Sequence, residues 1–199
     1  MDTLYVVKYS GPFGFIKPWT AVRDEEVYSQ QFLSPSIVSG IERKIFPELL
    51  NKKWGIYKIT GHRLTYTQIA QQQEQTQPRG WNEKKKGGGK EYLRPYSILK
   101  RGILVNPLLF LAFGSLKDAE AASQQHICLA RNEDVLYPDA DIMEVSNQEF
   151  NENEELFSGF ELIFEKTENS FLVGYNRLND NKPMYGWLKT VGNPVKTYY

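Results

Sequence analysis

The sequence predicts an α+β fold of the ferredoxin-like class, with elements in the order β-α-β-β-α-β. Apolar and β-branched runs recur as strands, and two segments carry apolar residues at helical spacing. A long basic insertion, at about residues 70–95, separates the two middle strands. With 199 residues, of which 41% are hydrophobic, the chain has enough apolar surface for one sizeable core. We therefore expect one domain over residues 1–148 and a short C-terminal β appendage over residues 149–199.

The first half of the domain begins with a strand over residues 3–11, which is rich in β-branched and aromatic residues. An irregular loop follows. Ser34 is the expected N-cap of a helix that runs to Phe46, and Pro35 is its first helical residue, where the missing N–H costs nothing. Gly40 costs this helix about 1 kcal/mol relative to alanine, so we expect another group to approach closely there. Apolar residues at helical spacing form its core face: Ile37, Val38, Ile41 and Ile45.

The second half continues with strands on both sides of the insertion and ends in a strand-rich segment. Its expected elements are one long or bent strand over residues 52–70, a strand over 96–113 interrupted at Asn106-Pro107, a helix over 115–131, a strand over 134–146, an acidic linker over 147–155 and three strands over 156–192.

The insertion ends in an unusual segment, "PRGWNEKKKGGGKEYLRP", over residues 78–95. Three consecutive glycines lose much backbone entropy on ordering, which predicts a mobile loop. Densely packed lysines repel one another unless a polyanion lies between them. A solvated surface loop is the plain interpretation, and a loop that becomes ordered on RNA is the alternative.

Charge is divided unevenly along the chain, although the net charge is zero. Residues 1–105 carry 17 lysines and arginines against 9 acidic residues, whereas residues 106–199 carry 7 against 15. Such an asymmetry points to a nucleic-acid partner for the basic half. The acidic half would face a partner protein or keep the molecule in solution.

The residue types of the basic half are those that bind single-stranded RNA. Lysines neutralise phosphates as point charges, arginines grip them bidentately, and aromatic faces stack on bases. Individually each residue has an ordinary structural interpretation, and their co-occurrence carries the prediction. The predicted RNA-binding residues are Lys17, Trp19, Arg23, Ser36, Arg63, Arg79, Trp81, Lys84, Lys85, Lys86, Lys90, Tyr92 and Arg94.

Other chemistries find little support in the sequence. The single cysteine, Cys128, excludes an internal disulfide and suits a reducing cytoplasm. No apolar run has the length of a membrane span, and neither a cofactor motif nor a metal-ligand spacing is present. One enzymatic alternative stays open: metal-free RNA cleavage, with His62, Arg63 and Tyr66 acting together with the lysines.

The segment "FLSPSIVSGIERKIF" resembles the P-S-x-x-x-G-[IL] helix start of the RAMP proteins in the fifth CRISPR-associated (Cas) family. Pro35, Ser36, Gly40 and Ile41 match this motif, and "KKWGIYKI" resembles the second strand of that family. The resemblance covers about the first 60 residues. The remainder agrees in layout only.

The resemblance implies an end subunit of Cascade, the RNA-guided surveillance complex of type I CRISPR systems. Such subunits cap the 5′ handle of the guide RNA, contact the large subunit and the first backbone subunit, and carry a thumb-like insertion. Target DNA near the protospacer-adjacent motif is a further implied partner. Most members do not cleave RNA, so we expect a non-catalytic protein. The alternatives are a guide-processing endoribonuclease of the same family and an RNA-recognition domain of another ribonucleoprotein.

Overall fold

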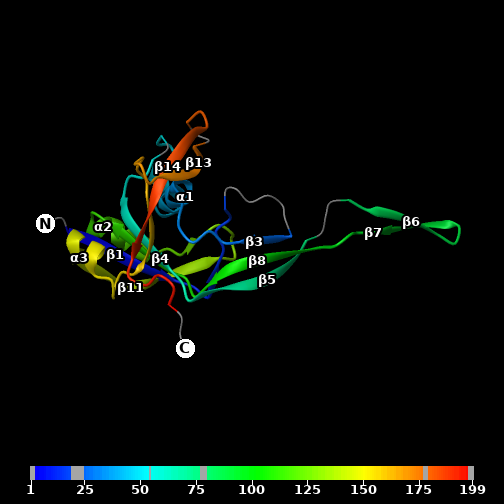
Figure 1. Ribbon diagram of the computed structural model, residues 1–199, viewed down its shortest axis with the longest axis horizontal. Coiled ribbons are helices and arrows are strands. Elements are labelled where there is room, and N and C mark those ends of the chain that lie inside the picture. Colours follow the sequence, from blue (N-terminus) through cyan, green and yellow to red (C-terminus); the bar gives the residue numbers. More distant parts are fainter. Residues whose placement is uncertain (1–2, 19–24, 54, 77–79, 177–178, 197–199) are drawn as a thin grey trace.

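Strands make up most of the structure, a computed structural model that describes residues 3–18, 25–53, 55–76, 80–176 and 179–196 (Figure 1). The described elements are, in chain order, β1 (Thr3–Ser10), β2 (Phe13–Gly14), β3 (Glu26–Tyr28), α1 (Pro35–Ile45), a 3-10 turn (Pro47–Leu49), β4 (Ile59–Thr65), β5 (Gln68–Thr76), β6 (Asn82–Lys86), β7 (Gly89–Leu93), β8 (Ser97–Val105), β9 (Leu108–Phe113), α2 (Leu116–Ser123), β10 (Ile127–Cys128), β11 (Val135–Ser146), α3 (Asn147–Glu152), β12 (Gly159–Ile163), β13 (Phe171–Asn176) and β14 (Lys182–Val191).

The largest sheet has eight strands in the order β10-β11-β1-β9-β4-β12-β14-β13. Every neighbouring pair in this sheet is antiparallel. The C-terminal strands join it where β12 pairs with β4, with Phe160 opposite Leu64. The segment expected to be an appendage is therefore part of the main sheet.

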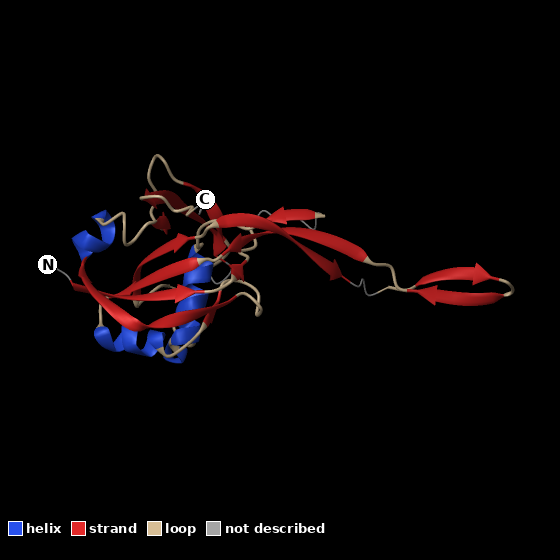
Figure 2. Ribbon diagram, turned by 90° about the horizontal axis from the view of Figure 1, so that it is seen from below, coloured by secondary structure: helices blue, strands red, loops and turns tan. Residues whose placement is uncertain are grey.

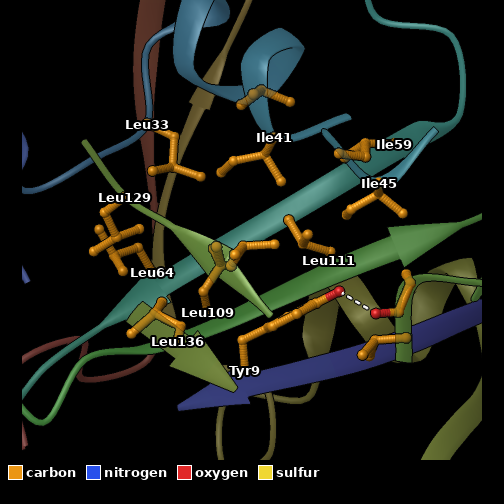
Figure 3. Packing of buried hydrophobic residues seen from close by; sticks show 14 of the residues in the cluster. Tyr9, Leu33, Ile41, Ile45, Ile59, Leu64, Leu109, Leu111, Leu129 and Leu136 are labelled. Carbon is orange, nitrogen blue, oxygen red and sulfur yellow. Dashed lines mark hydrogen bonds between the residues drawn. The ribbon is translucent and has the colours of Figure 1, made fainter. Parts of the chain in front are cut away.

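Helices α1 and α2 lie together against one face of this sheet (Figure 2). Their apolar side chains pack on those of β1, β4 and β9, and Ile41 and Ile45 of α1 point toward Leu111 (Figure 3). The buried hydroxyl of Tyr9 on β1 donates a hydrogen bond of 2.7 Å to the carbonyl oxygen of Ala122 on α2. This contact ties α2 to the centre of the sheet.

The opposite face of the sheet has a smaller apolar cluster. Val6 on β1 and Phe110 on β9 pack against Phe150 on α3 and against Phe157, which follows it. Ser146 caps α3 by accepting a hydrogen bond of 3.0 Å from the backbone N–H of Glu149. The capped helix α3 thus positions the Phe150 ring over this face of the sheet, next to Phe157.

The insertion between β4 and β9 forms a long β-ribbon, which we call the arm (residues 68–105). Strand β5 pairs with β8 from Gln68–Val105 to Thr76–Ser97, and β6 pairs with β7 beyond them. Both views show the arm projecting away from the main sheet and its helices (Figures 1 and 2). Gly87 and Gly88 form the turn at its tip with φ of 56° and 86°, the left-handed values that a two-residue type I′ hairpin requires.

The predicted α+β ferredoxin-like class is wrong. The predicted alternation is present along β1, α1, β4, β9, α2 and β11, but those strands are only half of an eight-stranded antiparallel sheet. Strand pairing between distant segments, together with the arm, makes the chain mainly β.

Local differences accompany this correction. Helix α2 ends at Ser123 rather than near residue 131, because Ile127 and Cys128 pair with Leu136 and Val135 as β10. The expected acidic linker contains α3. The expected mobile loop over residues 78–95 contains a hairpin, since two of the three glycines supply its turn.

Candidate nucleic-acid interface

The register of the hairpin assigns each side chain at the arm tip to one of two faces. Residues directly opposite each other in a β-ladder point to the same side, and the side alternates along each strand. Tyr92 lies opposite Glu83 and Lys90 lies opposite Lys85, so these pairs share one face. Lys84 and Lys86, opposite Glu91 and Gly89, point to the other. The four lysines therefore do not form a single patch.

The first of these faces also carries the aromatic groups of the tip. Trp81 and Arg94 lie two residues beyond the Glu83–Tyr92 pair, and the Arg94 guanidinium sits 4.7 Å from the centroid of the Trp81 ring. Trp81 is 58% exposed and Tyr92 is 55% exposed. We call this set the aromatic face of the arm: Trp81, Lys85, Lys90, Tyr92 and Arg94.

Each face of the hairpin contains one cross-strand ion pair. The Lys90 Nζ lies 3.0 Å from an oxygen of Glu83, and the Lys86 Nζ lies 3.9 Å from one of Glu91. Exposed pairs of this kind contribute at most about 1 kcal/mol. Because β6 and β7 together contain four lysines and two glutamates, the folded hairpin keeps an excess of positive charge.

A second candidate surface is a cleft of 810 Å³ between α1 and the hairpin formed by β13 and β14. Its lining includes Lys17, Ser36, Gly40 and Arg43 on one side and Tyr175 and Asn176 on the other. A Cβ at Gly40 would have no neighbouring atom within 4 Å, so protein packing does not explain the glycine. The first turn of α1 contains no acidic residue, so no carboxylate there opposes an anion near the positive end of the helix.

Buried hydrogen bonds fix the position of α1 beside this cleft. The carboxylate of Glu42, which is fully buried, accepts from the backbone N–H groups of Tyr57, Lys58 and Ile59 at 2.5 to 3.0 Å. Ser39 donates a hydrogen bond of 3.0 Å to the carbonyl oxygen of Gly55. The helix is thus anchored to the segment before β4, and its exposed side forms the cleft wall.

The group considered for metal-free RNA cleavage lies in the core. Tyr66 is 3% exposed, and its hydroxyl donates to the side-chain oxygen of Gln31. His62 is 3% exposed and stacks on Phe164. Burial, together with the positive charge of Arg63, lowers the pKa of His62 to about 3. A neutral imidazole without access to solvent is poorly placed to reach a ribose hydroxyl.

Arg63, which the sequence assigned to RNA, is also placed in the core. Its side chain is fully buried and forms an ion pair with Glu161 on β12 and a hydrogen bond of 3.0 Å to Asn151. Its guanidinium lies 4.6 Å from the Phe150 ring centroid. A phosphate could reach it only if this cluster opened, so we leave Arg63 out of the interface.

The other predicted residues fall into three groups. Trp81, Lys85, Lys90, Tyr92 and Arg94 come together on the aromatic face, Lys17 and Ser36 line the cleft, and Lys84 and Lys86 occupy the opposite face of the arm. Trp19, Arg23 and Arg79 lie outside the residues that the structure describes.

Sequence reasoning did not assign Arg43, Tyr175 or Asn176 of the cleft to any site. Arg43 follows Ser36 and Gly40 at spacings of four and three residues, the spacing of one helical face, so periodicity on the polar side of α1 could have identified it. Tyr175 and Asn176 gave no such signal, because the position of β13 depends on pairing within the C-terminal segment.

Within the described ranges, no helix is long and apolar enough to cross a membrane, and no cluster of three or more histidine, cysteine or acidic residues could hold a metal ion. Neither the protein-family models nor the curated proteins searched match this chain. The resemblance to the fifth Cas family is therefore a proposal.

Proposed function

We propose that this protein is a non-catalytic RNA-binding subunit of a type I CRISPR Cascade complex, where it caps the 5′ handle of the guide RNA. The observation that carries the proposal is the aromatic face of the arm. Two exposed rings and three cationic side chains share one side of the hairpin formed by β6 and β7, at the end of the arm that projects away from the main sheet (Figure 1). The arm leaves the fold between the middle strands β4 and β9, as a thumb-like insertion would.

The physical basis of binding is stacking combined with charge neutralisation. Stacking of a base on an exposed aromatic ring contributes about 1–3 kcal/mol and tolerates any base. Lys85, Lys90 and Arg94 would neutralise the phosphates between stacked bases. A two-stranded ribbon alone is marginally stable in water, so RNA lying on it would also stabilise the arm itself.

The cleft would provide a second contact for the same RNA. Lys17 and Arg43 bring positive charge to it, and the hydroxyl of Ser36 lies beside the N-terminus of α1. Gly40 leaves the helix backbone open between them, so a flat or bulky group could approach closely. We infer that Gly40 serves binding rather than packing.

The nuclease alternative has less physical support than the non-catalytic one. Its histidine and tyrosine are buried, and burial keeps the imidazole neutral. Incubation of the purified protein with precursor guide RNA in EDTA tests this point, and discrete cleavage would favour the endoribonuclease. Neighbouring genes unrelated to CRISPR would favour an RNA-recognition domain of another ribonucleoprotein.

The deciding experiment changes Lys84, Lys85, Lys86 and Lys90 together to alanine in a reconstituted complex. We expect loss of guide loading and of complex yield, because the four lysine charges that would neutralise phosphates at the hairpin are then removed. Lys117→Ala, at an exposed position of α2, is the control for charge removal. Wild-type loading and yield in the quadruple variant would refute the proposal.

A further inference from the structure

A regular series of side chains continues from the arm tip toward the body of the molecule. Every second residue from β7 into β8 is cationic, aromatic or apolar. We call these residues the track: Lys90, Tyr92, Arg94, Tyr96, Ile98 and Lys100. Side chains two residues apart in a strand point to the same side, which places Lys90 with Tyr92 on β7 and Ile98 with Lys100 on β8, and Arg94 and Tyr96 lie in the link between these two strands.

Exposure alternates in the same period from Pro95 to Lys100. Tyr96 is 70% exposed and Ile98 is 54% exposed, and Lys100 is exposed as well. Ser97 and Leu99 between them are half-buried. On the paired strand, Gln73 and Gln75 lie opposite Lys100 and Ile98 and are exposed too. The solvent-facing side of the ribbon is therefore the side of the track.

Two residues beyond Lys100, at the next position of the series, lies Gly102, and an aromatic ring from β3 covers it. A Cβ at Gly102 would clash with Cδ1 of Tyr28, so the Tyr28 ring lies directly over the glycine backbone. Glu26 accepts hydrogen bonds from the Tyr28 hydroxyl at 2.8 Å and from the Gln71 amide at 2.5 Å. Tyr28 is still 50% exposed. Because Gly102 has no side chain, the Tyr28 ring of β3 can occupy the position that follows Lys100 in the series.

We propose that single-stranded RNA lies extended along the track, from the arm tip to Tyr28. Lys90, Arg94 and Lys100 neutralise its phosphates, and successive bases stack on Tyr92, Tyr96 and Tyr28. The proposal rests on the RNA-binding function proposed above and adds the path and its residues. A fully extended chain from Lys90 to Lys100 would span about 33 Å, at about 3.3 Å per residue.

The composition of the track favours a single strand over other polyanions. Duplex RNA keeps its bases stacked inside, so exposed tyrosine rings would have nothing to stack on. An acidic peptide would need the cations but not the regularly spaced rings. The far end leads toward the cleft, because Gln30, two residues beyond Tyr28, lines it. The same strand can therefore continue from the arm into the cleft.

Fluorescence anisotropy with a short fluorescent single-stranded RNA tests the track through two variants at the foot of the arm. Tyr96→Ala is expected to weaken affinity by about tenfold, within the range for one stacked base. Lys100→Ala is expected to reduce the slope of log affinity against log salt by about 0.7, the contribution of one phosphate contact on a single strand. Lys117→Ala is the matched control and should change neither quantity.

The outcomes separate the track from the RNA-binding function itself. If the lysine variant of the arm tip loses affinity while Tyr96→Ala and Lys100→Ala bind as wild type, the track is refuted and the function stands. If the wild-type protein does not bind the RNA, both the track and the proposed RNA-binding function are refuted. Equal affinity for a duplex of the same sequence, or for poly-glutamate, would also overturn the single-strand assignment. Circular dichroism of each variant checks that the fold is retained.

Discussion

The buried imidazole of His62 should make the protein unstable in mild acid. The folded state holds His62 neutral, with a pKa of about 3, because burial and the charge of Arg63 both disfavour protonation. In the unfolded chain the same group titrates near 6.5. Below pH 6.5 the unfolded state therefore binds a proton that the folded state does not, and stability falls as pH falls.

The size of this effect follows from the difference between the two pKa values. Each pH unit between them lowers the free energy of unfolding by about 1.4 kcal/mol per group. Between pH 6.5 and pH 5, before most carboxylates titrate, His62 should cost about 2 kcal/mol. His62→Phe keeps a ring against Phe164 and removes the proton site, so this part of the pH dependence should disappear.

Urea unfolding followed by circular dichroism from pH 7 to pH 5 measures this slope. The matched control is His126→Gln, because His126 is the other histidine and is exposed. The control should retain the wild-type slope. An unchanged slope in His62→Phe, or loss of the slope in the control, would refute the assignment of His62 as a buried neutral residue and reopen its use as a base.

Three substitutions test how the cleft and the arm are built. Glu42→Ala orphans three backbone N–H groups and should cost about 3–5 kcal/mol in urea unfolding, whereas Glu42→Gln keeps one acceptor and should cost less than half of that. Gly88→Val, at φ 86°, should abolish the hairpin signals of the tip in NMR spectra, while Gly89→Val should preserve them. Gly40→Leu should unfold no more easily than wild type, since an added Cβ there meets open space, and it should weaken RNA binding. Comparable losses of folding stability and of RNA affinity would indicate a packing role for Gly40.

Local sequence signals identified the elements with strong boundaries. Helix α1 begins at Pro35 after Ser34, as predicted, and ends at Ile45, one residue before the predicted end at Phe46. The interruption at Asn106-Pro107 is confirmed, because Asn106 adopts a φ of 47° between β8 and β9. The three C-terminal strands are confirmed as well. In each case neighbouring residues alone specify the turn or the cap.

Long-range pairing explains most of what the sequence did not reveal. Arg63 looked available for RNA because Glu161, its partner, lies 98 residues away and reaches it only through the pairing of β12 with β4. One missed element had a local signal: Ser146 and Glu149 form the S-x-x-E pattern of a helix start, which identifies α3.

The arm shows how one residue pattern can have two interpretations. The three glycines suggested disorder, but positive φ at Gly87 and Gly88 is also what a tight hairpin requires. Alternation of residue type from Lys90 to Lys100 was visible in the sequence. Its structural basis is clear only once Ser97–Val105 is known to be a strand in which Ile98 and Lys100 are exposed while Ser97 and Leu99 are half-buried.

The central claim is that RNA binds one face of the arm. Two double variants test it: Lys85→Ala/Lys90→Ala on the aromatic face and Lys84→Ala/Lys86→Ala on the opposite face. Each removes the same charge from the same hairpin, including one lysine that is paired with a glutamate. In RNA titrations at matched salt, we predict that the first variant loses at least tenfold more affinity than the second, because only its lysines flank the stacked bases. Equal losses of affinity in the two variants would contradict the claim, because they would show that RNA responds to the total positive charge of the hairpin and not to one of its faces.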